Sequence, residues 1–374
     1  MNPSSGPIEP PPPKRRQSQR TLARKGARWD THTHAEILEI VAKLLIEGKT
    51  NRELVAHMHD AENEPSFTPH HLYHLEQEIW SYLTFKFSFD GRDRAMGASL
   101  QQAYPTLKAV VVVCGVTVAP FAIHAATHII DSIDSWLVAN RADERAVYRI
   151  GLYGGRTIKA IMQALSEALI AIDEDKKRHY PKLIFHALSG ATSLHHISGP
   201  SQYFAYFENP LLAPLDIEFV DFAPLHPAFG AVRAQALGCN LVLTSIGDFH
   251  DEHSVFGSLR LTNLPAWEEL RQAQCVGDLA QLPVSSSGPL SLHLPPSALQ
   301  LRDLRTMLKS GSARVMAFVT PCCCCGQPKL AILKTLMALL QDSAHQLFSD
   351  LLIDRWSATH LLRPTIYERL PPRK

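Results

Sequence analysis

The segment YRIGLYGGRTIKAIMQALS, residues 148–166, decides the fold of this chain. A short apolar run ends before Gly154 and Gly155, and Arg156 and Thr157 then begin an amphipathic helical pattern. A strand that turns tightly into a helix is the repeating unit of a parallel α/β sheet. The N–H groups at such a helix start, with the helix dipole, bind anions, so these four residues form a candidate phosphate site. An ordinary tight turn explains the pattern equally well.

The alternation of short apolar runs and helical patterns extends along the chain from about residue 106 and predicts a Rossmann-like parallel sheet. Strands are expected at 108–114, 148–153, 182–188, 217–222, 240–245, 314–320 and 350–353. Helices are expected at 120–140, 156–172, 228–237, 264–273, 298–309, 328–341 and 356–362. Ligands of such sheets lie beyond the carboxyl ends of the strands.

Other segments that follow expected strands also carry polar residues. In CGQPK, residues 325–329, Lys329 begins a helix where a phosphate could bind, or it is simply an exposed lysine. SIGDF, residues 245–249, places a glycine where the backbone can approach a ligand. VGDLA, residues 276–280, is a further candidate. The glycine pattern at 154–155 is neither a Walker A loop nor G-x-G-x-x-G, so no cofactor is expected.

The first 29 residues form a Pro-rich and basic arm that we expect to be disordered. Residues 1–13 hold six prolines, and seven basic residues without an acid follow: Lys14, Arg15, Arg16, Arg20, Arg24, Lys25 and Arg28. Such an arm is either a solvated tail or a segment that binds nucleic-acid phosphates by counterion release.

Residues 30–90 read as a small helical domain. Apolar residues recur at helical spacing from Ile37 to Leu45, Gly48 ends that helix, and a second and a third helix follow, the third at 68–83. This layout is typical of a helix-turn-helix unit. The third helix lacks Lys and Arg, so a degenerate unit kept for packing or dimerisation is an open alternative. Its candidate DNA contacts are His70, His71, His74 and Gln77.

Composition limits the classes of function. The 374 residues carry 37 Lys+Arg against 36 Asp+Glu, a net charge of +1 that excludes a uniformly basic nucleic-acid coat. The seven cysteines lack paired spacing, and no apolar stretch opens the chain, so we expect a cytoplasmic protein without membrane contact. The apolar run at 109–124 is best explained by a buried strand leading into a helix. Neither the run Cys322–Cys325 nor the pair His70 and His74 has the partners of a zinc site, so no metal is expected.

Five segments, taken in order, resemble the sugar-binding effector domain of the SorC family of bacterial transcriptional regulators. They are IGLYGGRTIKAIMQAL (150–165), NLVLTSIG (240–247), VGDLAQLPVSSSG (276–288), GQPKLAIL (326–333) and LLIDRWSATHLL (351–362). The resemblance implies an α/β effector domain at 106–374, a linker at 91–105 and an N-terminal DNA-binding unit. It also implies a phosphorylated sugar as effector and a homo-tetramer or dimer.

The resemblance further implies roles for single residues. Gly154, Gly155, Arg156 and Thr157 would cradle the phosphate and Lys329 would pair with it, while Gly247, Asp248 and Asp278 would line the sugar side. An alternative is an enzyme of the related phosphosugar isomerase and deaminase class. That chemistry needs a positioned acid or base, and Asp248, Asp278 and Asp354 show no telling spacing, so catalytic residues are not expected. A diverged scaffold that binds neither ligand nor DNA is the third alternative.

Overall fold

The fold is taken from a computed structural model. It describes residues 31–46, 49, 51–68, 71–72, 75, 91–114, 118–140, 146–190, 199–222, 229–290, 297–322 and 324–362. The basic arm and most of the expected third helix, including His70, His74 and Gln77, lie outside these residues.

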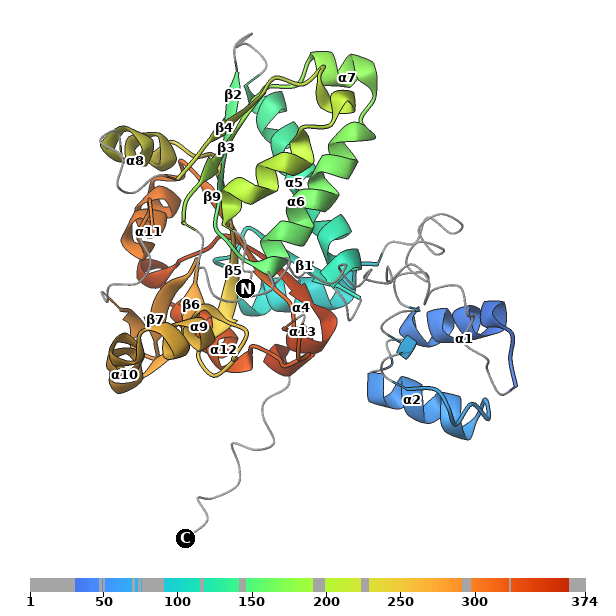
Figure 1. The fold of residues 1–374 in the computed structure, drawn as a ribbon. Coiled ribbons are helices and arrows are strands. Elements are labelled where there is room, and N and C mark those ends of the chain that lie inside the picture. Colours follow the sequence, from blue (N-terminus) through green and yellow to red (C-terminus); the bar gives the residue numbers. More distant parts are fainter. Residues whose placement is uncertain are drawn as a thin grey trace, which may run out of the picture.

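A parallel sheet forms the centre of the molecule (Figure 1). Its strands are β1 (Ala109–Val113), β2 (Val147–Leu152), β3 (Lys182–Ala187), β4 (Ile217–Val220), β5 (Leu241–Asp248), β9 (Arg314–Val319) and β10 (Asp350–Asp354). They lie in the order β1-β10-β9-β5-β2-β3-β4. From β2 the chain continues outward to β3 and β4, whereas from β5 it proceeds to β9 and β10 on the other side. The strand order therefore reverses between β2 and β5, which is where α/β sheets bind ligands.

Helices cover both faces of this sheet (Figure 1). One apolar core holds side chains of α5 (Val118–Ala139), α6 (Arg156–Ile170) and the 3₁₀ helices η2 (Pro200–Phe207) and η3 (Pro210–Leu212). The other holds side chains of α4 (Arg94–Ala103), α8 (Phe229–Leu237), α11 (Leu301–Ser310), α12 (Leu330–Leu339) and α13 (Arg355–Leu362). Side chains of one strand alternate between the two cores, for instance Val315 and Met316 of β9. Burial on both faces explains why the strands are continuous apolar runs.

Three short antiparallel strands extend β5 beyond the main sheet. They are β6 (Cys275–Leu279), β7 (Leu282–Ser285) and β8 (Gly288–Pro289), and β6 pairs with the last residues of β5. A satellite cluster of apolar residues joins this extension to α9 (Val255–Thr262) and α10 (Leu264–Gln272). The remaining short elements are α7 (Glu174–Arg178) and η4 (Ser343–His345).

The N-terminal helices form their own small core. α1 (His34–Ile46) and α2 (Asn51–Asp60) bury Ile37, Val41, Leu54 and Met58 together. The expected first and second helices are therefore present, with Asn51 as the first residue of α2. Buried Glu64 fixes the start of this unit, because its Oε1 accepts hydrogen bonds from the amides of Thr31 and His32, both at 2.7 Å.

The sequence predicted the main sheet closely and its additions poorly. All seven expected strands and all seven expected helices of the α/β part are present, with ends shifted by a few residues. The prediction that residues 91–105 form a linker is wrong. These residues contain α4, whose cap residue Asp93 binds Arg355 of α13 at 3.1 Å and whose buried Leu100 joins the core. This segment packs against the sheet because its apolar residues recur at helical spacing.

Candidate functional site

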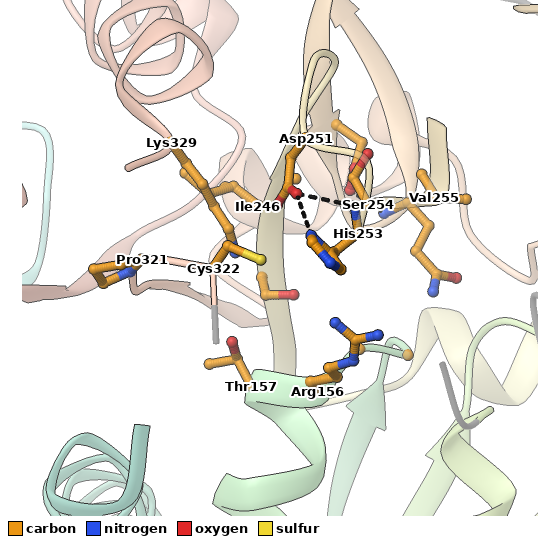
Figure 2. A pocket seen from close by; sticks show the side chains of 16 residues that line it. Arg156, Thr157, Ile246, Asp251, His253, Ser254, Val255, Pro321, Cys322 and Lys329 are labelled. Atoms are coloured by element: carbon orange, nitrogen blue, oxygen red, sulfur yellow. Dashed lines mark hydrogen bonds and ion pairs between the residues drawn. The ribbon is translucent and has the colours of Figure 1, made fainter. Parts of the chain in front are cut away.

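A pocket lies beyond the carboxyl ends of β2 and β5, at the reversal of strand order (Figure 2). Its walls come from the β2–α6 turn, the end of β5, the β5–α9 loop, β6 and the β9–α12 loop. The residues that line it include Gly154, Gly155, Arg156, Thr157, Gly247, Asp251, His253, Asp278, Gln281, Cys322 and Lys329. The structure thus brings the expected phosphate-site residues together with two of the three residues expected on the sugar side.

The glycine pair forms the tight turn that the sequence predicted. Gly155 has φ 136°, which side chains rarely adopt, and a Cβ there would lie 3.1 Å from Ser245 Oγ. The amides of the pair already have acceptors, because Gly154 N–H donates to Ser189 Oγ (3.2 Å) and Gly155 N–H to the Tyr203 hydroxyl (2.9 Å). The two glycines therefore shape the helix start, and an anion would contact groups further along the first turn of α6.

Arg156 and Thr157 begin α6 and extend toward the opposite wall (Figure 2). The Arg156 guanidinium donates to Cys324 Sγ at 2.6 Å, which links α6 to the β9–α12 loop. The buried Thr157 hydroxyl lies 3.1 Å from the Thr320 hydroxyl, just beyond β9. Lys329 immediately precedes α12 and lines the same pocket, so two cations from different elements face one space at a helix N-terminus.

Gly247 and Asp278 face each other across the antiparallel pair of β5 and β6. A Cβ at Gly247 would lie 2.2 Å from Asp278 Oδ2, so this position accepts only glycine while the carboxyl stays where it is. Asp278 is buried, and its Oδ1 accepts a hydrogen bond from the Gln281 amide at 3.0 Å. Burial raises the pKa of Asp278 to about 7, although the Gln281 amide and the charge of Lys329 act to lower it. The raised pKa favours the protonated, neutral form of this carboxyl.

Asp248 ends β5 next to the pocket and is not among the lining residues. Its Oδ1 accepts a hydrogen bond from the His250 amide at 2.9 Å. Burial nevertheless raises the pKa of Asp248 above its usual value. Both acids expected on the sugar side thus carry less negative charge than exposed carboxylates at the same pH.

Sequence reasoning missed Gln281 as a lining residue. Ala280 and Gln281 connect β6 to β7 with φ of 62° and 60°, a conformation that such two-residue turns usually assign to Asn and Gly. Gln281 Oε1 is buried, and no donor among the described residues reaches it. A strained turn that holds an unpaired acceptor at a pocket is a feature of ligand-binding sites. The only signal for it in the sequence is that the two residues of this turn include neither Gly nor Asn.

Sequence reasoning also missed the β5–α9 loop. Asp251 and His253 line the pocket beside Cys322 (Figure 2). Burial would raise the pKa of Asp251, but hydrogen bonds to its carboxylate, including one from the His253 amide, hold that pKa below its usual value. Burial raises the pKa of the Cys322 thiol to about 12, so it is a neutral thiol in this form. Cys324 and Cys325 are exposed, which shows that the cysteine run passes beyond the buried strand into a loop.

One expected DNA contact lies within the described residues. His71 Nδ1 accepts a hydrogen bond from the Thr68 amide at 3.2 Å and lies 3.1 Å from its hydroxyl. The ring also packs against Phe67, with centroids 6.2 Å apart. These contacts place His71 at the start of the segment expected as the third helix. In the part of the chain that the structure describes, no helix combines the length and the apolarity needed to cross a bilayer.

No protein-family model matches the sequence, and no curated protein matches it. In fold the chain is similar to solved structures of transcriptional regulators. The full-length sorbitol operon regulator SorC from Klebsiella pneumoniae is 13% identical with a TM-score of 0.49, covering 89% of this chain and 100% of that chain. A putative SorC family regulator from Enterococcus faecalis is 14% identical (TM-score 0.49), and a probable sor operon regulator from Shigella flexneri is 15% identical (TM-score 0.47). Each of these two comparisons covers 72% of this chain and 100% of the other. Proteins of the SorC family, which the sequence segments resemble, are therefore among the structures to which this chain is similar.

Proposed function

We propose that this chain is a transcriptional regulator whose pocket binds a phosphorylated sugar and whose N-terminal part binds DNA. The observation that carries the proposal is the convergence of Arg156 and Lys329 at the N-terminus of α6, in a pocket at the reversal of strand order. Two cations beside a helix N-terminus favour a dianionic group such as a phosphate. The solved structures of similar fold include one described as a domain of a possible sugar-binding transcriptional regulator from Arthrobacter aurescens.

Asp278 and Gln281 line the same pocket and suit a polyhydroxylated group. The protonated form of Asp278 both donates and accepts hydrogen bonds, and Gln281 Oε1 offers a buried acceptor. Sugar hydroxyls can satisfy both, whereas a second phosphate would be repelled by the ionised form of Asp278. A phosphorylated sugar therefore fits the charge pattern of the pocket better than a bisphosphate with phosphates at both ends.

We propose binding without turnover. Isomerases and deaminases of this class need an acid or base of tuned pKa at the reacting carbon. Asp278 has such a pKa, but its Oδ1 already accepts a hydrogen bond from the Gln281 amide, and Asp248, the other acid expected on the sugar side, does not line the pocket. Incubation of the full chain with each ligand that binds, followed by chromatography of the products, tests this point.

Ligand binding in the pocket would change DNA affinity by shifting an equilibrium between oligomer geometries. The seven basic residues of the arm at 14–28 would supply phosphate contacts that the acidic third-helix segment lacks. DNA affinity should therefore fall steeply with salt and be lost when residues 1–28 are deleted. An affinity that is insensitive to salt and unchanged by this deletion contradicts the DNA-binding half of the proposal.

The ligand half is tested by thermal unfolding with a panel of phosphorylated sugars, the same sugars without phosphate, and inorganic phosphate. A ligand at 100 times its Kd should stabilise the protein by about 2.7 kcal/mol. Hydrogen bonds to charged groups contribute about 1.5–3 kcal/mol, so Arg156→Ala and Lys329→Ala should each weaken binding roughly 10- to 100-fold. The matched control is Lys159→Ala, an exposed lysine one turn further along α6.

Two outcomes contradict the ligand proposal. One is the absence of stabilisation by any phosphorylated sugar in the panel. The other is equal binding by the wild type, Arg156→Ala and Lys329→Ala, which would place the ligand elsewhere on the molecule.

A further inference from the structure

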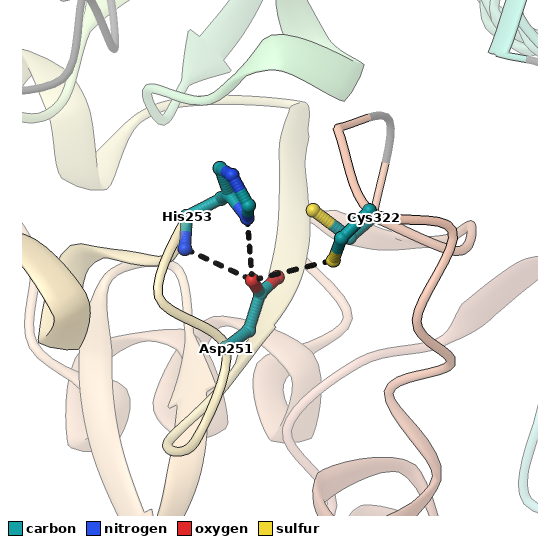
Figure 3. Close-up of side chains that lie close together, drawn as sticks. Asp251, His253 and Cys322 are labelled. Atoms are coloured by element: carbon teal, nitrogen blue, oxygen red, sulfur yellow. Dashed lines mark hydrogen bonds and ion pairs between the residues drawn. The ribbon is translucent and has the colours of Figure 1, made fainter.

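Four side chains from two loops lie close together beside the pocket, and Figure 3 labels three of them, Asp251, His253 and Cys322. Asp251 and His253 belong to the β5–α9 loop, and Cys322 and Cys325 belong to the β9–α12 loop. One carboxylate oxygen, one imidazole nitrogen and two sulfurs all lie within 4.8 Å of one another. The loops are about 70 residues apart in sequence and meet because β5 and β9 are neighbours in the sheet.

The carboxylate of Asp251 lies at the centre of the cluster. Its Oδ1 accepts hydrogen bonds from the His253 amide at 2.9 Å and from Cys325 Sγ at 3.8 Å, and it lies 3.3 Å from His253 Nδ1. Figure 3 shows these contacts converging on the carboxylate. The hydrogen bond from the His253 amide holds the carboxylate near the two sulfurs before any ion is bound.

The two cysteines are presented by a tight turn. Cys322 N–H donates to Gln327 O (2.9 Å), and Gly326 N–H donates back to Cys322 O (2.8 Å). Gly326 has φ 68°, a conformation that favours glycine and lets the chain reverse directly after Cys325. The spacing of Cys322 and Cys325 is C-x2-C, the commonest spacing of two zinc ligands in one loop.

We propose that Asp251, His253, Cys322 and Cys325 bind one Zn²⁺ ion. Two thiolates and an imidazole are soft or borderline ligands that favour zinc over magnesium or calcium. Around a tetrahedral zinc with 2.3 Å bonds to sulfur, the two sulfurs lie about 3.8 Å apart, so small side-chain rotations complete the site. Two thiolates and a carboxylate leave one net negative charge on the zinc complex.

The role of this zinc is structural. Four protein ligands fill a tetrahedral ion and leave no open position for a substrate or for water. The ion fastens the β5–α9 loop to the β9–α12 loop, and both loops line the pocket. Lys329 follows Cys325 by four residues, so the ion also fixes the start of the segment that carries this lysine.

The test uses the full chain, produced without a histidine tag and purified with a thiol reductant. After dialysis against limiting Zn²⁺, elemental analysis should give one zinc per chain. Exchange for Co²⁺ should give the intense visible absorption of a tetrahedral cobalt thiolate. Cys325→Ser and His253→Ala should each weaken zinc binding by more than the roughly 10- to 100-fold that follows loss of an outer-shell partner. The matched control is Cys324→Ser, which removes an exposed thiol of the same turn and should keep the metal.

The proposal is overturned by three results. These are a chain that binds no zinc after dialysis, a Cys324→Ser variant that loses zinc as fully as Cys325→Ser, and a native Cys322–Cys325 disulfide in the protein as isolated from cells. The His253→Ala variant protects the test against misfolding, because the His253 side chain is 40% exposed and its removal leaves the apolar cores intact. Circular dichroism of each variant verifies the fold.

Discussion

Replacement of Asp278 by Asn should stabilise the protein, and increasingly so as the pH rises. The ordinary pKa of an aspartate is 3.8, and burial between β5 and β6 raises that of Asp278 to about 7. A carboxyl with a raised folded-state pKa takes up a proton on folding. Its presence therefore costs nothing below about pH 3.8, and stability is lost as the pH rises from there to about 7.

The size of the effect follows from the two pKa values. Each pKa unit corresponds to about 1.4 kcal/mol, so ionised Asp278 costs the folded state about 4 kcal/mol above pH 7. Asn has the same shape, and its Oδ1 can still accept the hydrogen bond from the Gln281 amide. Asp278→Asn should thus gain up to about 4 kcal/mol relative to the wild type at pH 8 and only about half as much or less at pH 5.

Urea unfolding followed by circular dichroism at pH 5, 6, 7 and 8 measures this difference. The control is Asp175→Asn, because the Asp175 side chain is 87% exposed. Its effect should be small and nearly independent of pH. The reasoning is refuted if the difference between Asp278→Asn and the wild type stays constant from pH 5 to pH 8. That result would mean that the pKa of Asp278 in the folded protein is not raised above its usual value.

Three further substitutions test the supports of the pocket and the sheet. Tyr203→Phe removes the hydroxyl that binds both the amide and the carbonyl of Gly155, and should cost about 1–2 kcal/mol in urea unfolding and weaken phosphosugar binding. Gly155→Ala forces a side chain into φ 136° and toward Ser245, and should cost about 1–3 kcal/mol in the same assay. Arg314→Met leaves buried Asp350 without its guanidinium partner, and should lower the free energy of unfolding by about 3–5 kcal/mol.

The main sheet could be predicted because its local patterns agree with its tertiary environment. The apolar run of β9 is buried on both faces and is flanked by helices whose own apolar residues recur at helical spacing. The β6–β7 hairpin could not be predicted. Its turn is formed by Ala280 and Gln281, which lack the Asn-Gly signature, and Asp278 and Pro283 are unusual in strands. The cross-strand contact between Asp278 and Gly247 sets this pairing, and no sequence pattern records it.

The candidate phosphate site stays a prediction, and the structure supports part of the reasoning that led to it. Arg156 and Lys329 do line one pocket, since both follow strands whose carboxyl ends lie at the same edge. The expectation that Gly154 and Gly155 offer their amides to a ligand misses Ser189 and Tyr203, which accept those amides from distant parts of the chain. The four-cysteine run was dismissed as a metal site for want of a second pair of ligands. That pair, Asp251 and His253, comes from another strand-to-helix loop.

Burial lets the acids of the pocket coexist with a bound phosphate. Burial raises the pKa of Asp278 to about 7 and that of Asp248 above its usual value. Lys329 also acts to lower the pKa of Asp278. A phosphate bound to Lys329 offsets that positive charge, so it favours the protonated carboxyl, the form that can donate a hydrogen bond to a sugar hydroxyl. Phosphate binding to Lys329 and protonation of Asp278 therefore support each other.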